Sequence, residues 1–259
     1  LEGKQPNPRL VLCLASYKSL NKYEWSDAII VTNSLQEVYT RQVLEPKEEE
    51  KLKSEIKVLG KISNRISSKV REQYEESPYP RWVNLGLRHK SCSIRQVVSE
   101  ENLRVLNQSI NEVKAPKILI AGCGTGEHSI VTAARFENSE VLAVDLSLSS
   151  LAYAKRKTKE INLRNINYMQ ADILDLQKLG RKFDIIESIG VLHHMEDPMA
   201  GFKVLVDCLK SGGLLKIGLY SELARKSVVE VRKEITKSNI STNADEILSF
   251  RNQIIKSGN

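Results

Sequence analysis

The sequence predicts an α/β fold in which a parallel β-sheet carries helices on both faces. The main observation is that five short apolar runs alternate with segments of helical length between about residues 116 and 220. The runs are KILIA (117–121), EVLAVD (140–145), NINYMQAD (165–172), FDIIES (183–188) and LLKIGLY (214–220), and the helical segments are 126–136, 147–161 and 198–210. This alternation is typical of a parallel sheet. Right-handed crossovers then bring the carboxyl ends of the strands to one edge, where such sheets bind ligands.

The region before the sheet, residues 1–115, is predicted to be helical. The segment Pro46–Ser77 opens with a proline and an acidic run, which favour the start of a helix. Apolar residues then recur every three or four positions, and Gly60 is a point where the segment can divide into two helices. These apolar residues are Leu52, Ile56, Leu59, Ile62, Ile66, Val70 and Tyr74. The two prolines of Ser77–Trp82 exclude a helix interior there, and residues 93–113 are predicted to be helical again.

The last part of the chain contains no strand-like run and is predicted to form polar helices. We therefore expect three parts: an N-terminal helical region (1–115), a sheet domain (116–220) and a C-terminal helical segment (221–259). The chain begins with Leu1 rather than Met, so we also expect it to be a truncated piece of a longer protein.

Composition excludes several classes of protein. With 41% hydrophobic and 27% charged residues among 259, a mainly disordered chain is not expected. No window approaches about 18 uncharged apolar residues and no signal peptide is visible, so we expect no membrane association and a cytoplasmic location. The net charge is +7, but basic residues are scattered and only 5% of residues are aromatic, so a nucleic-acid partner is not expected. The four cysteines (Cys13, Cys92, Cys123, Cys208) are far apart in sequence, and neither a metal site nor a redox pair is expected.

A glycine-rich loop follows the first predicted strand and precedes a predicted helix. Its residues are Gly122, Cys123, Gly124, Thr125 and Gly126. Glycines in this position allow a tight turn and a close approach of the backbone to a ligand. We expect Cys123 to be a small filler whose backbone faces that ligand.

Two aspartates end the next two predicted strands. Asp145 ends EVLAVD, where a carboxylate can accept both ribose hydroxyls of an adenosine; the alternative is that it caps the helix beginning near Ser147. Asp172 follows the third strand, where it can accept the adenine amino group, with Ile173 packed on the ring. The alternative for Asp172 is a turn or cap residue.

The spacing of the loop favours one adenosine cofactor over another. A dinucleotide site usually has the spacing G-x-G-x-x-G and places a diphosphate at a helix N-terminus. Here the spacing is G-x-G-x-G, and the acidic Glu127 follows at once. Because Glu127 would repel a diphosphate, the loop favours an adenosyl sulfonium over NAD.

The strings ILIAGCGTG, VLAVDLS, ADILDL and FDIIESIGVLHHMEDP, taken in order, resemble the motifs of class I S-adenosylmethionine-dependent methyltransferases. The resemblance covers about residues 116–220 and implies a Rossmann-like sheet and the cofactor S-adenosyl-L-methionine. The segments REQYEESPYPRW and KIGLYSELAR more loosely resemble the methyltransferase part of bacterial proteins that carry tetratricopeptide repeats upstream.

The resemblance implies roles for individual residues. The glycine loop (122–126) would lie next to the methionine part of the cofactor, Asp145 would bind the ribose, and Leu146 would lie beside the adenine. Asp172 and Ile173 would contact the adenine, and the backbone at Ser188 would face the methionyl group.

Two departures from the family pattern stand out. The family usually has an acid two residues before the first glycine, which helps to position the cofactor's ammonium group, and this chain has Ile120. The family also has seven strands, and no candidates for the last two follow LLKIGLY. We therefore predict five strands in the spatial order 3-2-1-4-5, with one exposed edge.

Residues near the predicted acceptor side each have two candidate roles. His193 and His194 follow the fourth strand and are candidate general bases; alternatively they are loop residues that bond the backbone. Tyr79, Arg81 and Trp82 could form a lid that shapes the acceptor pocket, or a linker that packs on the sheet domain. His128 could cap a helix or approach the cofactor's carboxylate.

Three functions remain open from the sequence. The first is methyl transfer from S-adenosylmethionine to a small-molecule or protein acceptor by in-line displacement. The second is an NAD-dependent oxidoreductase, and the third is a non-catalytic module that binds a cofactor or a partner protein.

Overall fold

The computed structural model describes residues 4–241 and 243–257, so Leu1, on which the expectation of a truncated chain depends, lies outside them. The chain forms two compact units, residues 1–218 and residues 219–259. The first unit contains the sheet and the helices that precede it. The division into three domains at about residues 115 and 220 stays a prediction.

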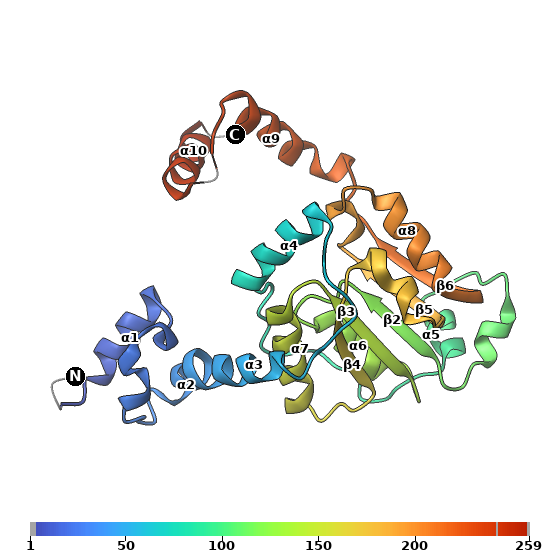
Figure 1. Ribbon diagram of the computed structural model, residues 1–259, viewed down its shortest axis with the longest axis horizontal. Coiled ribbons are helices and arrows are strands. Elements are labelled where there is room, and N and C mark those ends of the chain that lie inside the picture. The colour runs from blue at the N-terminus through green and yellow to red at the C-terminus, as the bar shows by residue number, and fades with distance from the viewer. Residues whose placement is uncertain (1–3, 242, 258–259) are drawn as a thin grey trace. The chain divides into compact units, whose positions relative to one another are not determined.

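Six strands form one parallel sheet in the first unit (Figure 1). The strands are β1 (Lys57–Val58), β2 (Lys117–Ala121), β3 (Glu140–Asp145), β4 (Ile166–Gln170), β5 (Phe183–Ile189) and β6 (Leu209–Gly218). Their spatial order is β1-β4-β3-β2-β5-β6. The predicted order 3-2-1-4-5 is confirmed for the five expected strands. The fifth strand ends at Gly218 rather than Tyr220 and begins five residues earlier than its apolar run.

The first strand was not predicted. The segment Pro46–Ser77 was expected to be helical, but it contains β1, which pairs in parallel with β4 at Met169 and Gln170. The edge of β4 presents backbone groups that need partners, and this requirement overrides the helical periodicity of the segment. Gly60 lies in the connection between β1 and the next helix, as expected for a dividing residue.

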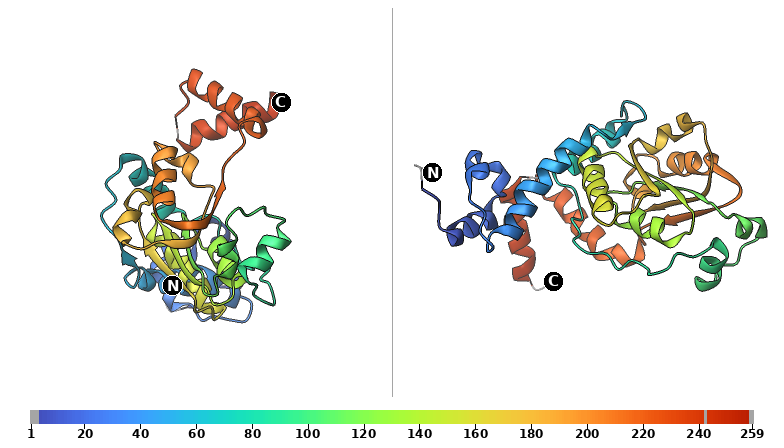
Figure 2. Two further views of the ribbon diagram at one scale, coloured as in Figure 1. Left: turned by 90° about the vertical axis from the view of Figure 1, so that its right-hand side faces the viewer. Right: turned by 90° about the horizontal axis from the view of Figure 1, so that it is seen from below.

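Helices cover both faces of the sheet (Figure 2). On one face pack α5 (Ile94–Glu100), α6 (Glu127–Arg135) and α7 (Leu148–Glu160), and on the other pack α8 (Pro198–Asp207) and the 3₁₀ helix Ile173–Leu179. The helices predicted at 126–136 and 147–161 are confirmed, and the one predicted at 198–210 is present but ends at Asp207, because β6 begins at Leu209. The helix predicted over 93–113 is wrong in its second half, because α5 ends at Glu100 and a 3₁₀ helix, Gln108–Glu112, follows a loop.

Helices precede and follow β1 in the N-terminal region. They are α1 (Pro8–Tyr17), two 3₁₀ helices (Leu20–Lys22 and Glu24–Ala28), α2 (Gln36–Tyr39), the π-helical turn Thr40–Leu44, α3 (Glu45–Lys53) and, after β1, α4 (Arg65–Glu76). The elements from α1 to the π-helical turn share a small core of their own. The buried residues of this core are Val11, Ala15, Leu20, Ile29, Leu35 and Val43. The N-terminal region is therefore mostly helical as predicted, apart from β1 and the loop that follows α5.

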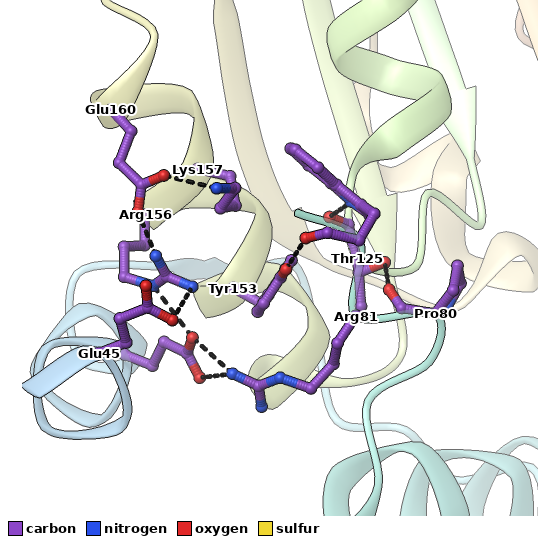
Figure 3. A network of polar contacts seen from close by, with 10 residues as sticks. Glu45, Pro80, Arg81, Thr125, Tyr153, Arg156, Lys157 and Glu160 are labelled. Atoms are coloured by element: carbon purple, nitrogen blue, oxygen red, sulfur yellow. Dashed lines mark hydrogen bonds and ion pairs between the residues drawn. The ribbon is translucent and has the colours of Figure 1, made fainter. Parts of the chain in front are cut away.

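A buried cluster of charges joins α3 to α7 (Figure 3). The guanidinium of Arg156 is 2% exposed and donates to Glu49 at 3.0 Å and to Glu45 at 3.1 Å. It also pairs with Glu160, to which Lys157 donates at 2.6 Å. A buried cation requires such partners, so these carboxylates fix where α3 lies against α7.

The second unit contains α9 (Lys226–Lys237) and α10 (Ala244–Ser257), and no strand occurs in residues 219–241 and 243–257. The prediction of helices without strands is confirmed for that described part. Among the residues that the structure describes, no helix has both the length and the apolar character needed to cross a membrane.

The charge cluster predicts a large effect of a single substitution. Replacing Arg156 by Met removes the cation of half-buried Glu45 and one of the two cations of buried Glu49, which keeps Arg81, and should lower the free energy of unfolding by about 2 kcal/mol. The matched control is Arg95→Met, whose partner Glu112 is exposed and whose loss should cost less than about 1 kcal/mol. Denaturant unfolding followed by circular dichroism measures both, and equal costs would contradict this account of how α3 is held.

Candidate active site

A cavity of about 540 Å³ lies at the carboxyl ends of the strands. Its floor comes from the glycine loop after β2 and from the residues that follow β3, β4 and β5, and α4 contributes a further wall. The lining residues are Ile66, Ser67, Val70, Tyr74, Tyr79, Pro80, Gly122, Cys123, Gly124, Thr125, Glu127, His128, Val131, Asp145, Leu146, Ala171, Asp172, Ile173, Ile189, Gly190, Val191, His194 and Met195. The parallel sheet therefore collects chain segments from 66 to 195 at one site.

The glycine loop is held tightly against its neighbours. The amides of Gly122 and Cys123 both donate to the Val144 carbonyl, at 2.9 and 3.0 Å. Gly126 has φ +88°, and a Cβ there would lie 2.5 Å from the Cβ of Ala154. Only glycine fits this backbone shape and this contact with α7. Gly122, Cys123, Gly124 and Thr125 line the cavity, whereas Gly126 serves the turn behind it.

The Asp145 carboxylate lines the cavity and also shapes the loop. Its Oδ2 accepts from the Gly124 amide at 2.7 Å, and its Oδ1 accepts from the Ser147 amide at 3.0 Å. Burial raises the pKa of Asp145, and these amide donors act against that rise. Ser147, rather than Asp145, is the N-cap of α7. Each carboxylate oxygen can accept a further hydrogen bond, so ribose binding by Asp145 stays a prediction.

The residues after β4 also reach the cavity. Asp172 and Ile173 line it, as does Leu146, which follows β3. Asp172 caps the following 3₁₀ helix through a hydrogen bond from the Leu174 amide to Oδ1 at 3.0 Å. The capping alternative for Asp172 is therefore present, and its contact with adenine stays a prediction. Ser188 is fully buried and donates to the Ala121 carbonyl at 3.0 Å, away from the lining residues.

The wall formed by α4 was not foreseen from the sequence. Ile66, Val70 and Tyr74 recur on one helix face and point at the cavity. The periodicity was visible, but a pattern of apolar residues does not say what they pack against. Glu75 fixes this end of α4, because its Oε2 accepts from Ser147 Oγ at 2.8 Å and from the Ser149 amide at 3.1 Å.

The proline-rich segment after α4 combines both predicted alternatives. Tyr79 and Pro80 line the cavity, whereas Arg81 and Trp82 do not. Trp82 donates to the Thr125 carbonyl at 3.0 Å and packs edge-on against Tyr153 of α7. Thr125 in turn donates to the Pro80 carbonyl at 2.5 Å (Figure 3).

Arg81 extends this attachment to α3. Its guanidinium donates to both carboxylate oxygens of Glu49, at 2.9 and 3.1 Å, and lies over the ring of Tyr153. Glu49 is the same carboxylate that Arg156 binds. Arg81 and Trp82 thus clamp the segment to the glycine loop, α3 and α7.

Three histidines lie at or near the cavity. His194 lines it, and its Nε2 lies 3.1 Å from Nε2 of His193, which is not among the lining residues. His128 also lines the cavity, and its Nε2 lies 2.7 Å from Oε2 of Glu187. Burial raises the pKa of Glu187, but the hydrogen bond and the charge of His128, a hydrogen bond from Thr132 and the charge of Lys216 outweigh it, so the pKa lies below its usual value. Among the described residues, no group of three or more His, Cys, Asp or Glu side chains is placed to hold a metal ion.

Comparison with known proteins agrees with this geometry. Residues 118–213 match the family described as "Methyltransferase domain". This confirms the methyltransferase resemblance for that part of the chain, which contains the glycine loop and both aspartates. Over 121 residues the chain is 36% identical to an uncharacterized protein of Synechococcus sp., covering 46% of this chain and 29% of the relative. Over 119 residues it is 34% identical to the ubiquinone biosynthesis O-methyltransferase of Coxiella burnetii, covering 46% of this chain and 49% of the relative.

Solved structures with a similar arrangement include two from bacteria. One is PKMT2 of Rickettsia typhi in complex with AdoHcy, with 24% identity, a TM-score of 0.44, and coverage of 56% of this chain and 29% of that one. The other is an S-adenosylmethionine-dependent methyltransferase of Clostridium acetobutylicum, with 25% identity, a TM-score of 0.39, and coverage of 58% of this chain and 56% of that one. The chain spans about half or less of the length of the two curated relatives described above.

The glycine loop predicts a difference between two alanine substitutions. Gly126→Ala and Gly190→Ala both place a side chain at positive φ, but a Cβ at Gly190 meets nothing within 4 Å. Gly126→Ala should therefore cost at least about 1 kcal/mol more, because the overpacking against Ala154 is added to the backbone strain. Denaturant titration of both variants measures the difference, and equal losses would refute the close contact between loop and α7.

Proposed function

We propose that the chain binds S-adenosyl-L-methionine in this cavity and transfers its methyl group to an acceptor. One observation carries the proposal: among the described residues that line the cavity there are three carboxylates and no Lys or Arg, although the chain has a net charge of +7. The carboxylates are Glu127, Asp145 and Asp172. Such a lining attracts a sulfonium cation and repels a diphosphate, so it disfavours NAD.

The residues present fit the adenosine part of this group. Asp145 can accept from the ribose hydroxyls, since each of its oxygens has capacity beyond the amide bonds that shape the loop. Asp172 can accept from the adenine amino group, and the apolar side chains of Leu146 and Ile173 can cover the ring. These roles are the ones that the resemblance to class I methyltransferases implies.

The bound donor would supply the reactive methyl carbon for an in-line displacement. The chain's own contribution is to hold the nucleophile in line and to exclude water, and orientation alone can supply several kcal/mol. His194 is the candidate for a general base because it lines the cavity, and His193 can act only through it. Both assignments belong to the proposal.

The lining residues outside the proposed adenosine contacts support a class of substrate. Several of them are apolar, among them Ile66, Val70 and Met195, and no Lys or Arg side chain occurs among the described lining residues. An anionic acceptor would find no partner for its charge, so we infer an uncharged, largely apolar small molecule, or a side chain of that kind on a protein. The Coxiella relative is named as an O-methyltransferase of ubiquinone biosynthesis, which agrees with this class.

Two wider features of the prediction stay proposals. The chain covers only part of its relatives, so the resemblance to methyltransferases with tetratricopeptide repeats rests on REQYEESPYPRW and KIGLYSELAR. In the structure, the first of these strings includes the end of α4 and the segment clamped to the glycine loop. This placement supports a role for the string in closing the cavity. A cytoplasmic location also remains a prediction.

Calorimetric titration tests the donor. S-adenosylhomocysteine should bind, and NADH should produce no heat of binding. Asp145→Asn removes the charge and keeps an acceptor for only one of the Gly124 and Ser147 amides, and should weaken binding by about tenfold or more. The control Asp175→Asn changes a carboxylate outside the cavity and should leave the affinity unchanged. Binding of NADH without binding of S-adenosylhomocysteine would reverse the proposal.

A panel of paired acceptors tests the substrate class. Each pair should contain a neutral phenol and the same phenol carrying a carboxylate, with transfer of a labelled methyl group as the measurement. The neutral member should be the better acceptor in each pair, because the cavity offers no cation to the carboxylate. Consistent preference for the anionic members would show that the charge of the lining does not select the acceptor.

A further inference from the structure

The position two residues before the first glycine of the loop cannot contact a ligand's ammonium group. Ile120 stands there, is fully buried and packs in the core cluster beneath α6. If the proposed function holds, the amino end of the methionine part must be met by other atoms of the chain. The following inference rests on that proposed function.

A buried carboxylate lies one strand away. Glu187 of β5 is the register partner of Ile120 of β2. Glu187 is two positions beyond Ile185, which shares the core cluster with Ile120, so all three side chains point to the same face of the sheet. The Glu187 side chain is only 5% exposed. The sheet therefore keeps a carboxylate at this level, but on the neighbouring strand.

Two residues of α6 hold this carboxylate. Thr132 Oγ1 donates to Oε2 of Glu187 at 2.7 Å, and Nε2 of His128 lies 2.7 Å from the same oxygen. His128 and Thr132 are four residues apart and so share a helix face. A carboxylate oxygen only 2.7 Å away requires a donor, so Nε2 of His128 carries the proton of this bond.

The other ring nitrogen of His128 has no hydrogen-bond partner among the residues that the structure describes, and the ring lines the cavity. When Nε2 is the donor in a neutral ring, Nδ1 is an acceptor. The pair then carries one net negative charge. His128 Nδ1 is then a hydrogen-bond acceptor at the cavity, and the Glu187 carboxylate adds a negative charge next to it. Both interactions favour binding of an ammonium group.

The sheet order puts this acceptor at the correct end of the cavity. The aspartates proposed to bind adenosine follow β3 and β4, on one side of β2. Glu187 belongs to β5 on the other side of β2, and His128 is anchored to it. A ligand whose nucleoside lies over β3 and β4 extends its amino-acid end across the glycine loop toward His128.

We infer that Glu187 and His128 together bind the α-ammonium group of the methionine part: His128 Nδ1 accepts its hydrogen bond, and Glu187 is the positioning residue that fixes the tautomer of His128. The nearby Glu127 adds a negative charge at the same end of α6 but is exposed to solvent. Screening makes its contribution smaller than that of the buried pair.

The test uses calorimetry with three ligands at about pH 8, where a free imidazole is neutral. S-adenosylhomocysteine has both the ammonium and the carboxylate, its decarboxylated analogue has only the ammonium, and 5′-methylthioadenosine has neither. Glu187→Gln keeps the shape, but its amide can donate to Nε2 and so places the proton on Nδ1. His128→Phe removes the acceptor with little change in shape. The control is Asp175→Asn, outside the cavity.

Both variants should lose about tenfold or more in affinity for the two ligands that carry the ammonium, and less than about twofold for 5′-methylthioadenosine. Binding of 5′-methylthioadenosine also reports that each variant has folded, and His128→Phe alone suffices if Glu187→Gln does not fold. Equal losses for all three ligands would assign the pair a structural role and overturn the inference. A loss of affinity for S-adenosylhomocysteine but not for its decarboxylated analogue would show that the pair interacts with the ligand's carboxylate, and would overturn the inference. Unchanged affinities for all three ligands would also overturn it. If the unsubstituted protein binds none of the ligands, the proposed function fails together with the inference.

Discussion

Parallel pairing of β2 with β3 on one side and with β5 on the other is the constraint on which the site depends. Because all three strands run the same way, the glycine loop, Asp145 and the segment after Ile189 emerge at one edge. The register also sets Glu187 beside Ile120, so a buried carboxylate remains at a level where the neighbouring strand has none. A register slip of one residue would turn these side chains to the opposite face.

The N-terminal region is fixed to this edge by polar contacts as well as by apolar residues such as Leu52 and Ile56, which lie in the same core cluster as α7 and the strands. Arg156 binds carboxylates of α3, Glu49 among them binds Arg81, and Trp82 binds the glycine loop. These contacts bring α4 to the cavity, where Glu75 anchors it at the start of α7. A polar helix of this length has little stability alone, so its structure depends on this docking. The position of α4 at the cavity therefore depends on the charge cluster around Arg156.

The sheet could be predicted because strand and helix alternate in the sequence with clear periods, and the order of five strands agreed with the resemblance. The glycine loop, Asp145 and Asp172 were predictable as neighbours, since each follows a strand whose end must lie at the same edge. The strand β1 and the wall formed by α4 were not, because both depend on partners more than 70 residues away in the sequence. Arg81 and Trp82 were recognised as notable, but only the positions of Glu49 and Thr125 decide that they clamp rather than line the cavity.

The central claim is that a cavity with carboxylates and no lining Lys or Arg among its described residues holds an adenosyl sulfonium between the glycine loop and α4. The most direct measurement is a crystal structure of the chain grown with S-adenosyl-L-methionine. The account predicts the ribose within hydrogen-bond distance of Asp145, the adenine between Leu146 and Ile173, and the amino end near His128. Density for the ligand at another place on the chain, or an empty cavity at saturating ligand, would contradict it.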